Sequence, residues 1–248
     1  MTSVKAALCS LIFSLRRKDV LPMTKLPPLS QRLKSALAYI NKGDIVADIG
    51  TDHAYLPIHL VLTGTCTRAH ACDVNEGPCI RARENAARYG VADKIEISRR
   101  DGLEGLSDSE INKFVIFGMG GELIASILER ASVRDGVEFV LNPMTKQEKL
   151  RSFLSENGFA ILDETIVFSD SKYYQIIYAK KNGKGESLTP AELKFGKINI
   201  EKRSPLFIEY AKKTRDELLR AHKMREESGA VKSDDDALLY ETEQILKS

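Results

Sequence analysis

Short apolar runs alternate with amphipathic segments along most of the chain. Runs rich in Val, Ile, Ala and Phe are typical of strands buried on both faces of a sheet, whereas apolar positions every three or four residues are typical of helices. Five strands are expected, at residues 45–49, 68–72, 94–98, 114–117 and 138–141. Helices are expected at residues 56–62, 78–89, 123–130 and 146–157. This alternation predicts an α/β fold with a parallel, doubly wound sheet and right-handed crossovers.

Residues 160–179 break the alternation. Two strand-like runs, at 160–168 and 172–179, are separated only by Ser169-Asp170-Ser171. Three residues are too few for the helix that joins parallel strands, so these two strands are predicted to form an antiparallel hairpin.

The segment before the first strand predicts one more helix. Ser30 can cap it, and its apolar positions repeat at helical spacing, at Leu33, Ala36, Leu37 and Ile40. Arg32 and Lys34 are expected to face outward. Both belong to a basic stretch, residues 5–42, in which Asp19 is the one acid. Such a stretch can meet phosphate although the whole chain has a net charge of only +2.

The composition changes after residue 181, where Asn182-Gly183-Lys184-Gly185 is typical of a linker. Thr189 and Ser204 are each followed by proline, which predicts two helix starts. A later helix has a seam with spacings of four and three, at Phe207, Ala211, Thr214, Leu218 and Ala221. Leu238 and Ile245, a heptad apart, predict a returning helix. We therefore predict a C-terminal α-helical coiled-coil hairpin at residues 186–248, after a larger domain at 26–181.

The composition narrows the class of protein. With 248 residues and 43% hydrophobic content, the chain can bury the core of one large domain. Its four cysteines have no zinc-like spacing, so reduced thiols and no metal site are expected. The apolar segment at 4–15 is too short to span a membrane and lacks a preceding basic cluster, so neither an anchor nor a signal peptide is expected. A cytoplasmic protein is predicted, with Met23 as a natural start and residues 1–25 as a disordered extension.

The loop after the first strand suits a nucleotide cofactor. Gly50 would let a ligand approach the backbone closely. A dinucleotide site has the pattern G-x-G-x-x-G, but here Asp52 stands at the second glycine position and Tyr55 at the third. A carboxylate there would repel a pyrophosphate. S-adenosylmethionine has no phosphate and carries an ammonium and a sulfonium group, so the same acid becomes favourable.

Acids follow the ends of successive predicted strands. Asp48 and Asp52 would bind the methionine end of S-adenosylmethionine, Asp73 the two ribose hydroxyls, and Asp101 the adenine amino group. Any one of them can also be a turn former or a helix cap. Four acids at successive strand ends favour the cofactor.

Four motifs resemble those of one family. They are Asp-Ile-Gly-Thr-Asp-His-Ala-Tyr-Leu-Pro at 48–57, Asp-Val-Asn-Glu-Gly-Pro at 73–78, Asp-Gly at 101–102 and Gly-Met-Gly-Gly at 118–121. From about Leu26 to its C-terminus, the chain resembles the bacterial tRNA (adenine-22-N1)-methyltransferase family. The resemblance implies a class I, Rossmann-like fold with a mostly parallel seven-stranded sheet. It also implies methyl transfer from S-adenosylmethionine to N1 of adenine 22, with tRNA as the partner.

The resemblance also implies the residues of the site. Cofactor contacts are expected from Asp48, Gly50, Thr51, Asp52, His53, Asp73, Val74, Asp101, Gly102, Gly118, Met119 and Gly120. The expected catalytic residues are Asp52, His53 and Asn142. The family usually has a glutamine where this chain has Asn142, before the proline that follows the fifth strand.

The chemistry of the base limits what these residues have to do. Adenine N1 has a lone pair at neutral pH, so methylation needs no prior loss of a proton, but the product is cationic. Placement is the main task, and a nearby carboxylate would stabilise the growing charge. Asp52 is the first candidate for that role, followed by Asn142 and Glu122. His53 can be a general base or can orient its neighbours.

Gly-Met-Gly-Gly at 118–121 bears on the acceptor atom. It stands where methyltransferases of exocyclic amines usually carry Asp/Asn-Pro-Pro-aromatic, which favours a ring nitrogen. Two other functions stay open. One is a methyltransferase of another RNA or of a small molecule, with the coiled coil forming a dimer. The other is a nonenzymatic nucleotide-binding adaptor, which the four acids argue against. The basic N-terminal helix and the lysine-rich C-terminal hairpin are the expected tRNA contacts, and the oligomeric state is left open.

Overall fold

The computed structural model describes residues 25–106, 110–183, 185–227 and 234–247, so most of the expected N-terminal extension lies outside the described residues. The described residues form a seven-stranded sheet with the strand order β3-β2-β1-β4-β5-β7-β6. Five strands are parallel: β1 (Val46–Ile49), β2 (Ala69–Asp73), β3 (Ile95–Arg99), β4 (Lys113–Met119) and β5 (Glu138–Pro143). The antiparallel strands are β6 (Phe159–Ser169) and β7 (Lys172–Lys181). The doubly wound sheet and its antiparallel hairpin are confirmed.

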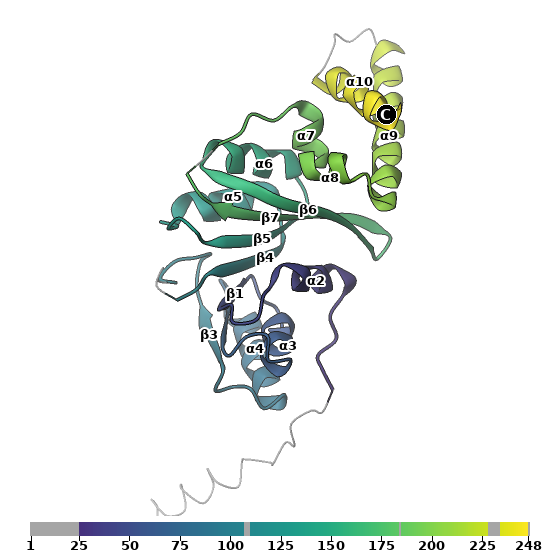
Figure 1. The fold of residues 1–248 in the computed structure, drawn as a ribbon. Coiled ribbons are helices and arrows are strands. Elements are labelled where there is room, and N and C mark those ends of the chain that lie inside the picture. The colour runs from purple at the N-terminus through teal and green to yellow at the C-terminus, as the bar shows by residue number, and fades with distance from the viewer. Residues whose placement is uncertain (1–24, 107–109, 184, 228–233, 248) are drawn as a thin grey trace, which may run out of the picture.

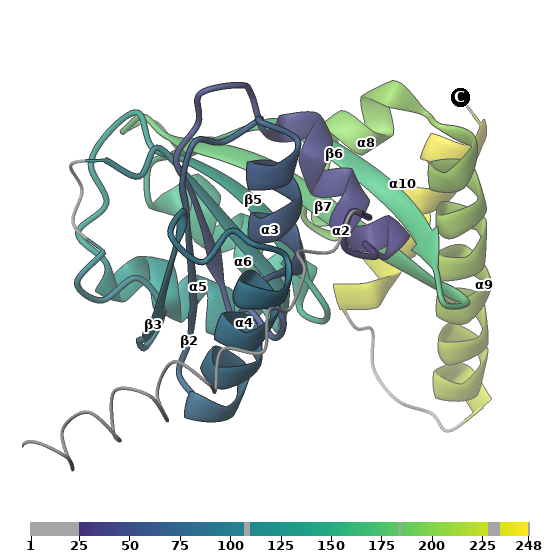
Figure 2. The same cartoon turned by 90° about the horizontal axis from the view of Figure 1, so that it is seen from below.

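Helices cover both faces of this sheet (Figures 1 and 2). One face packs against α5 (Gly121–Arg130) and α6 (Gln147–Glu156). The other face packs against α2 (Gln31–Ala36), the 3-10 turn η1 (Leu37–Tyr39), α3 (Tyr55–Leu62) and α4 (Glu76–Arg88). Ser30 caps α2 as predicted, because its Oγ accepts a hydrogen bond from the Leu33 N–H at 3.2 Å.

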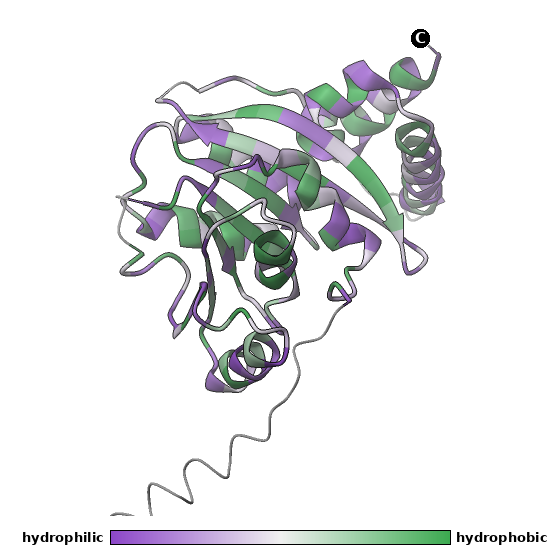
Figure 3. Cartoon of the chain, turned by 60° about the horizontal axis from the view of Figure 1, so that its bottom comes forward, coloured by the Kyte–Doolittle hydropathy of each residue, from purple (hydrophilic) through white to green (hydrophobic). Residues whose placement is uncertain are grey.

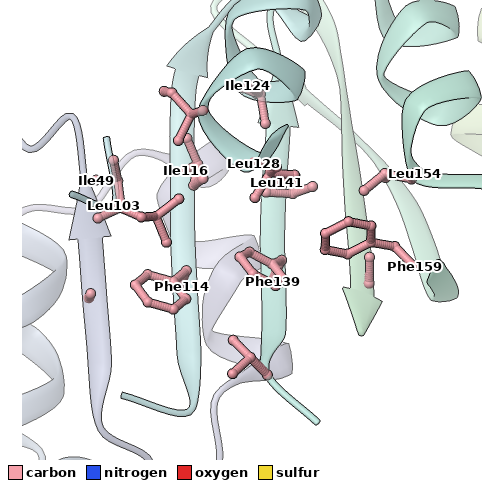
Figure 4. Packing of buried hydrophobic residues seen from close by; sticks show 14 of the residues in the cluster. Ile49, Leu103, Phe114, Ile116, Ile124, Leu128, Phe139, Leu141, Leu154 and Phe159 are labelled. Carbon is pink, nitrogen blue, oxygen red and sulfur yellow. The ribbon is translucent and has the colours of Figure 1, made fainter. Parts of the chain in front are cut away.

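The α5 and α6 face holds the larger apolar cluster, shown in Figure 4. Ile124 and Leu128 of α5 lie over β4 and β5, Leu154 of α6 lies near Phe159, and none of the three helix residues is more than 2% exposed. The rings of Phe114 and Phe139 stack at 5.5 Å between centroids. Each such buried side chain stabilises the fold by about 1.5–3 kcal/mol relative to leaving it exposed. The strands therefore form a firm base for the loops at their carboxyl ends.

Four helices follow the sheet: α7 (Pro190–Phe195), α8 (Lys197–Lys202), α9 (Pro205–Glu227) and α10 (Asp234–Lys247). Both predicted helix starts are confirmed. Thr189 and Glu192 form a capping box at α7, and the Ser204 Oγ accepts from the Phe207 N–H at 3.2 Å. In Figure 3, hydrophobic residues line the strands of the sheet, whereas hydrophilic residues cover much of the outer surface of the C-terminal helices.

The seam of α9 packs differently from the prediction. Phe207 and Ala211 are fully buried, and α10 packs beside them. However, the same cluster includes Ile166 of β6 and Phe195 of α7, whose ring meets that of Phe207 edge to face at 5.9 Å. The buried end of the seam therefore docks the helices on the sheet as well as on each other. The coiled-coil geometry stays a prediction, as do the two domain boundaries.

A buried ion pair strengthens this docking. Arg151 of α6 and Glu164 of β6 are both 0% exposed, with Nε and Oε1 at 2.8 Å. Arg151 Nη2 also donates to Gln175 Oε1 at 2.6 Å, and Nη1 donates to the carbonyl oxygen of Leu193 in α7 at 2.9 Å. Because an unpaired buried charge is very unfavourable, sheet and C-terminal helices depend on each other for stability.

Candidate active site

The carboxyl ends of the parallel strands meet at one edge of the sheet, where ligands bind in open α/β folds. The register aligns Ile49 of β1 with Cys72 of β2 and Ile116 of β4. Asp73 at the end of β2 lies beside Arg99 at the end of β3. The predicted site residues after these strands are therefore brought to a common edge.

Gly50 is held in a conformation that other residues avoid, with φ +78°. Its N–H and that of Thr51 donate to the Cys72 carbonyl oxygen at 2.8 and 3.0 Å. A Cβ on Gly50 would lie 2.3 Å from Met119 Cε. The side chain of Met119 thus lies against Gly50 and joins the loops after β1 and β4, and the close approach of a ligand to Gly50 stays a prediction.

Asp48 is the most deeply buried of the predicted acids, at 7% exposure. The pKa of its carboxyl is raised to about 6, mainly by burial and in part by the nearby charge of Asp73, although a hydrogen bond with Thr51 opposes the rise. An ionised carboxylate in this position is costly unless a cation approaches. Asp48 is therefore suited to an ammonium group.

Asp52 and His53 lie at the surface of the same loop. The Asp52 carboxylate is paired with the Arg81 guanidinium of α4, whose Nε donates to Oδ1 at 3.2 Å. His53 Nε2 lies 3.2 Å from Asp52 Oδ2, and its ring stacks on Tyr55. The Asn85 side-chain amide donates to the His53 carbonyl oxygen at 3.1 Å. This packing favours an orienting role for His53, and Asp52 already shares its charge with an arginine.

The loop after β2 carries Asp73 and Val74. Asp73 Oδ1 accepts from the Asn75 N–H at 2.7 Å, which fixes the carboxylate in the turn. The Val74 carbonyl oxygen accepts from Arg99 Nε at 2.9 Å, while its side chain is 51% exposed. A fixed carboxylate beside an exposed apolar side chain suits a ribose with its base.

The loop after β3 carries Asp101 and Gly102. Asp101 forms two hydrogen bonds with Arg130 of α5, at 2.7 and 3.2 Å, and this pairing lowers the pKa of the carboxyl. Gly102 has φ +61°, and a Cβ there would lie 2.8 Å from Ile127 Cγ2. A cavity of about 570 Å³ opens beside Asp101 and Arg130 and runs below this loop. Asp48 and Asp73 do not line it, and Asp101 is the predicted cofactor residue that does.

The loops after β4 and β5 form a second wall. The Met144 N–H donates to the Met119 carbonyl oxygen at 2.8 Å, and the Gly121 N–H donates to that of Thr145 at 2.7 Å. Gly118 has φ +81° and is exposed, and Gly120 directly precedes α5. Glu122 is exposed in the first turn of α5.

Asn142 lies at the base of this second wall and is 0% exposed. Its Nδ2 donates to the Gln175 carbonyl oxygen of β7 at 2.9 Å, and its Oδ1 accepts from Arg32 Nη1 at 3.3 Å. Both polar atoms of the amide are therefore engaged within the protein. This geometry favours positioning of a neighbour over direct contact with a base.

The sequence interpretation missed Arg32. We expected it to face outward, but its guanidinium lies over the Tyr174 ring, 5.4 Å from the centroid, and Nη1 also contacts Met144 Sδ at 3.3 Å. The same Nη1 is 3.5 Å from the position of a Cβ on Gly118. A signal was present, since Arg32 is three residues after Leu29 and four before Ala36, and both of these are buried.

Two classes of feature are not found in the part of the chain that the structure describes. No three His, Cys, Asp or Glu side chains there gather as metal ligands would. No helix there is long and apolar enough to cross a membrane.

Cys66, Cys72 and Cys79 are buried free thiols, and burial raises the pKa of Cys66 to about 11.

Comparisons with known proteins agree with this geometry. A methyltransferase domain family matches residues 29–177. The chain is 34% identical to the tRNA (adenine(22)-N(1))-methyltransferase of Bacillus subtilis over 172 residues, which are 68% of this chain and 72% of that protein. The chain belongs to the tRNA (adenine-22-N1)-methyltransferase family. The resemblance inferred from the four motifs is confirmed.

Solved structures of this family share the whole architecture. The B. subtilis m1A22 tRNA methyltransferase TrmK superposes with a TM-score of 0.75 at 28% identity, covering 90% of this chain and 97% of that one. Mycoplasma capricolum TrmK, solved in complex with the cofactor product S-adenosyl-homocysteine, superposes with a TM-score of 0.70 at 27% identity, covering 88% and 95%. Coverage near 90% includes the C-terminal helices, so the methyltransferase family shares them with this chain.

Proposed function

We propose that this protein transfers a methyl group from S-adenosylmethionine to N1 of adenine 22 in tRNA. The observation that carries the proposal is the row of carboxylates at consecutive strand ends, Asp48, Asp73 and Asp101, in a member of the tRNA (adenine-22-N1)-methyltransferase family. These groups suit a ligand with an ammonium, hydroxyls and an amino group. They do not suit the pyrophosphate of a dinucleotide.

The acids at the ends of β1, β2 and β3 would each bind a different part of the cofactor. Asp48 would hold the ammonium, because its buried carboxylate gains most from a cation. Asp73 would accept hydrogen bonds from the ribose, and Asp101 from the adenine amino group after it is released from Arg130. When bound, S-adenosylmethionine supplies an electrophilic methyl group on a sulfonium.

Catalysis would rest mainly on placement. The chain need not remove a proton from N1 before attack, so its residues would align the base and stabilise the positive charge that appears on it. The Asp52 carboxylate is exposed on the loop after β1 and is proposed for the second task. Its pairing with Arg81 has to loosen for the charge to act fully on the base.

The cations of the C-terminal hairpin that we expect to be available to phosphates differ in their surroundings; they are Lys202, Arg203, Lys212, Lys213, Arg215, Arg220 and Lys223. Lys202 is paired with Asp163 and Arg215 with Asp216. Lys223 lies 4.0 Å from Glu227, and Arg203 donates to the Ile245 carbonyl oxygen at 2.6 Å. The exposed cations proposed to contact RNA on α9 are therefore Lys212, Lys213 and Arg220.

Removing the C-terminal helices is not a clean test of this role, because the buried Arg151 would lose its α7 acceptors. A triple substitution of Lys212, Lys213 and Arg220 to alanine should keep the fold, because all three residues are exposed. It should weaken tRNA binding in a gel-shift and leave S-adenosylmethionine binding unchanged. Unchanged tRNA affinity would remove the helices from the RNA surface and favour dimerisation, which light scattering would measure.

Mass spectrometry of nucleosides tests the function. Purified protein, S-adenosylmethionine and a tRNA with adenine at position 22 should yield 1-methyladenosine, whereas the same tRNA with guanine at 22 should not. Calorimetry should show binding of S-adenosylmethionine and no comparable binding of NAD. Cofactor binding without methylation of the tRNA would contradict the RNA substrate and favour a small molecule. Since tRNA processing of this kind takes place in the cytoplasm, we propose that location.

A further inference from the structure

We infer that Arg32 binds a backbone phosphate next to the adenine that is methylated, and that Asn142 and Tyr174 hold its guanidinium in place for this contact. The inference rests on the proposed function, because it assumes an RNA substrate. Its starting point is the position of Arg32, which lies where the loops after β4 and β5 meet, against Gly118 and Met144.

All the contacts that the structure gives to the Arg32 guanidinium are neutral. They are the amide oxygen of Asn142, the sulfur of Met144 and the face of the Tyr174 ring. No carboxylate lies within ion-pair distance of Arg32 among the described residues. By contrast, Arg81 and Arg130 are paired with aspartates. Arg32 therefore presents a full positive charge that the protein holds but does not neutralise.

The donors of Arg32 are also free for a ligand. In the described part of the protein, the hydrogen bonds of this guanidinium come from Nη1, which leaves Nε and Nη2 without a protein acceptor. The side chain is partly buried, and it covers Tyr174, which is 9% exposed. A guanidinium that is fixed on one side and open on the other matches the bidentate geometry of a phosphate.

The reaction itself argues for a phosphate and against the base. Methylation at N1 makes adenine cationic, so a guanidinium against the ring would raise the energy of the transition state. A phosphate beside the same nucleotide is anionic before and after transfer, and its contact with Arg32 persists throughout. An adenine in folded tRNA has to be unstacked to reach the sulfonium, at a cost of about a few kcal/mol. A fixed phosphate contact next to it would offset part of that cost.

Asn142 is the positioning residue for this contact. Its orientation follows from its two neighbours, since Nδ2 faces the Gln175 carbonyl oxygen and Oδ1 faces Arg32. The opposite orientation would set two donors against each other at Arg32 and two acceptors at Gln175. The amide thus connects β7 to α2 and directs the guanidinium towards Gly118.

Binding and kinetics of three full-length variants test the inference. Arg32→Ala should weaken tRNA binding by about tenfold, the range of a charged hydrogen bond. It should also reduce the slope of log affinity against log salt concentration by about 0.7, the value for one phosphate contact on a single strand. S-adenosylmethionine affinity should stay within about twofold. Arg32→Lys should restore most of the salt slope, because it keeps the charge. Arg88→Ala, an equal loss of charge in the exposed last turn of α4, should change neither quantity.

A neutral linkage in the RNA locates the contact. A tRNA ligated from synthetic pieces can carry a methylphosphonate on either side of adenine 22. One of these two positions should lower wild-type affinity about as much as Arg32→Ala does, and combining the two changes should add little, since both remove the same contact. Additive losses at both positions would overturn the inference. So would an unchanged salt slope in Arg32→Ala, or a parallel loss of cofactor affinity.

The role of Asn142 has its own readout. Asn142→Ala should raise KM for tRNA towards the value of Arg32→Ala and leave kcat at saturating tRNA nearly unchanged, whereas Asn142→Gln should retain a low KM. A fall in kcat with unchanged KM would overturn the positioning role. The proposed function can fail separately. If the wild-type protein methylates no tRNA, that function is wrong, but if it methylates adenine 22 and Arg32→Ala does so equally well, only this inference is wrong.

Discussion

The edge of the sheet where the carboxyl ends of the parallel strands meet has two halves, and their charged side chains have different partners. The half formed by β1, β2 and β3 carries the acids Asp52 and Asp101, and each is paired with an arginine from a neighbouring helix. The half formed by β4, β5 and β7 carries Arg32, which is held by neutral groups. The first half suits a cationic cofactor, and we call it the cofactor half. The second half suits the anionic RNA that accepts the methyl group, and we call it the acceptor half. The first half also carries Asp48 and Asp73, which form no ion pair among the described residues, so the sign of each ligand is opposite to the unpaired charge on its own half.

The largest expected effect concerns Asp52, because it lies where the two halves meet. Asp52→Asn keeps the size of the side chain but removes the charge that would stabilise the methylated base. Turnover should fall by about a hundredfold, the usual size of such an electrostatic contribution. Cofactor affinity should fall by much less. Quench-flow methylation assays and calorimetry on the same protein measure the two.

A matched variant sharpens that result. Arg81→Met removes the arginine partner of Asp52 and leaves His53 as the neighbour of its carboxylate. Turnover should then be retained or increased. If Asp52→Asn keeps wild-type turnover, another group stabilises the charge. Glu122 is then the next candidate, because it is exposed directly after the loop that follows β4.

The second expected effect is confined to the cofactor half. Asp73→Asn weakens the acceptor for the ribose hydroxyls but can still accept from the Asn75 N–H. S-adenosylmethionine affinity should fall by about thirtyfold, within the range for a hydrogen bond to a charged group. Affinity for tRNA, measured by gel-shift, should not change. An unchanged cofactor affinity would contradict the assignment of Asp73 to the ribose.

The cofactor half was easier to predict from the sequence than the acceptor half, for a physical reason. Asp73 directly follows an apolar run, so its place at a strand end is a local property of the sequence. The partners of Arg32 are separated from it by 110 residues at Asn142 and by even more at Tyr174, and no local pattern connects them. The helical repeat around Arg32 indicated that its side chain points inward. We expected it to face solvent only because it is a basic residue. Contacts of this kind depend on the packing of α2 against β7.

The fold was predicted to within a few residues at most element ends. β4 is longer than expected, since it continues to Met119 and pairs with Pro143 after an irregularity at Phe117. The C-terminal helices were predicted as elements but not in their docking, because the buried pair of Arg151 and Glu164 leaves no periodic signal. Which residues pair with a buried charge could therefore be determined only from the structure.

The third prediction uses pH to separate stability from binding at Asp48. Burial raises its pKa to about 6, above its ordinary value of 3.8, so ionisation of this group opposes folding. Its contribution to the free energy of unfolding is therefore largest below pH 4 and is lost as pH rises through 6. Asp48→Asn should be more stable than wild type at pH 7.5, on the order of 2 kcal/mol, with the difference vanishing near pH 4. Urea unfolding from pH 4 to 8 measures this.

The same carboxylate should have the opposite effect on the cofactor. Ionised Asp48 is needed to bind the ammonium, so wild-type affinity for S-adenosylmethionine should fall as pH drops below about 6. The affinity of Asp48→Asn should be low and nearly independent of pH in that range. Lower stability of the variant at pH 7.5 would show that Asp48 has a structural role that outweighs the cost of its burial.

The smallest expected effect concerns Asp101, because its carboxylate has to exchange Arg130 for the adenine amino group of the cofactor. Arg130 holds this carboxylate through two hydrogen bonds in an exposed pair, and such pairs contribute little to stability. In the proposed complex, the adenine amino group takes over the same oxygens. Arg130→Met should therefore tighten S-adenosylmethionine binding by about twofold and leave the unfolding midpoint nearly unchanged. A weaker complex would mean that Arg130 orients Asp101 for the adenine. In that case the arginine would hold the Asp101 carboxylate in the orientation that the cofactor needs. The two halves would then differ in which group is oriented, an acid by Arg130 or Arg32 by neutral groups, and not in whether a charge is neutralised.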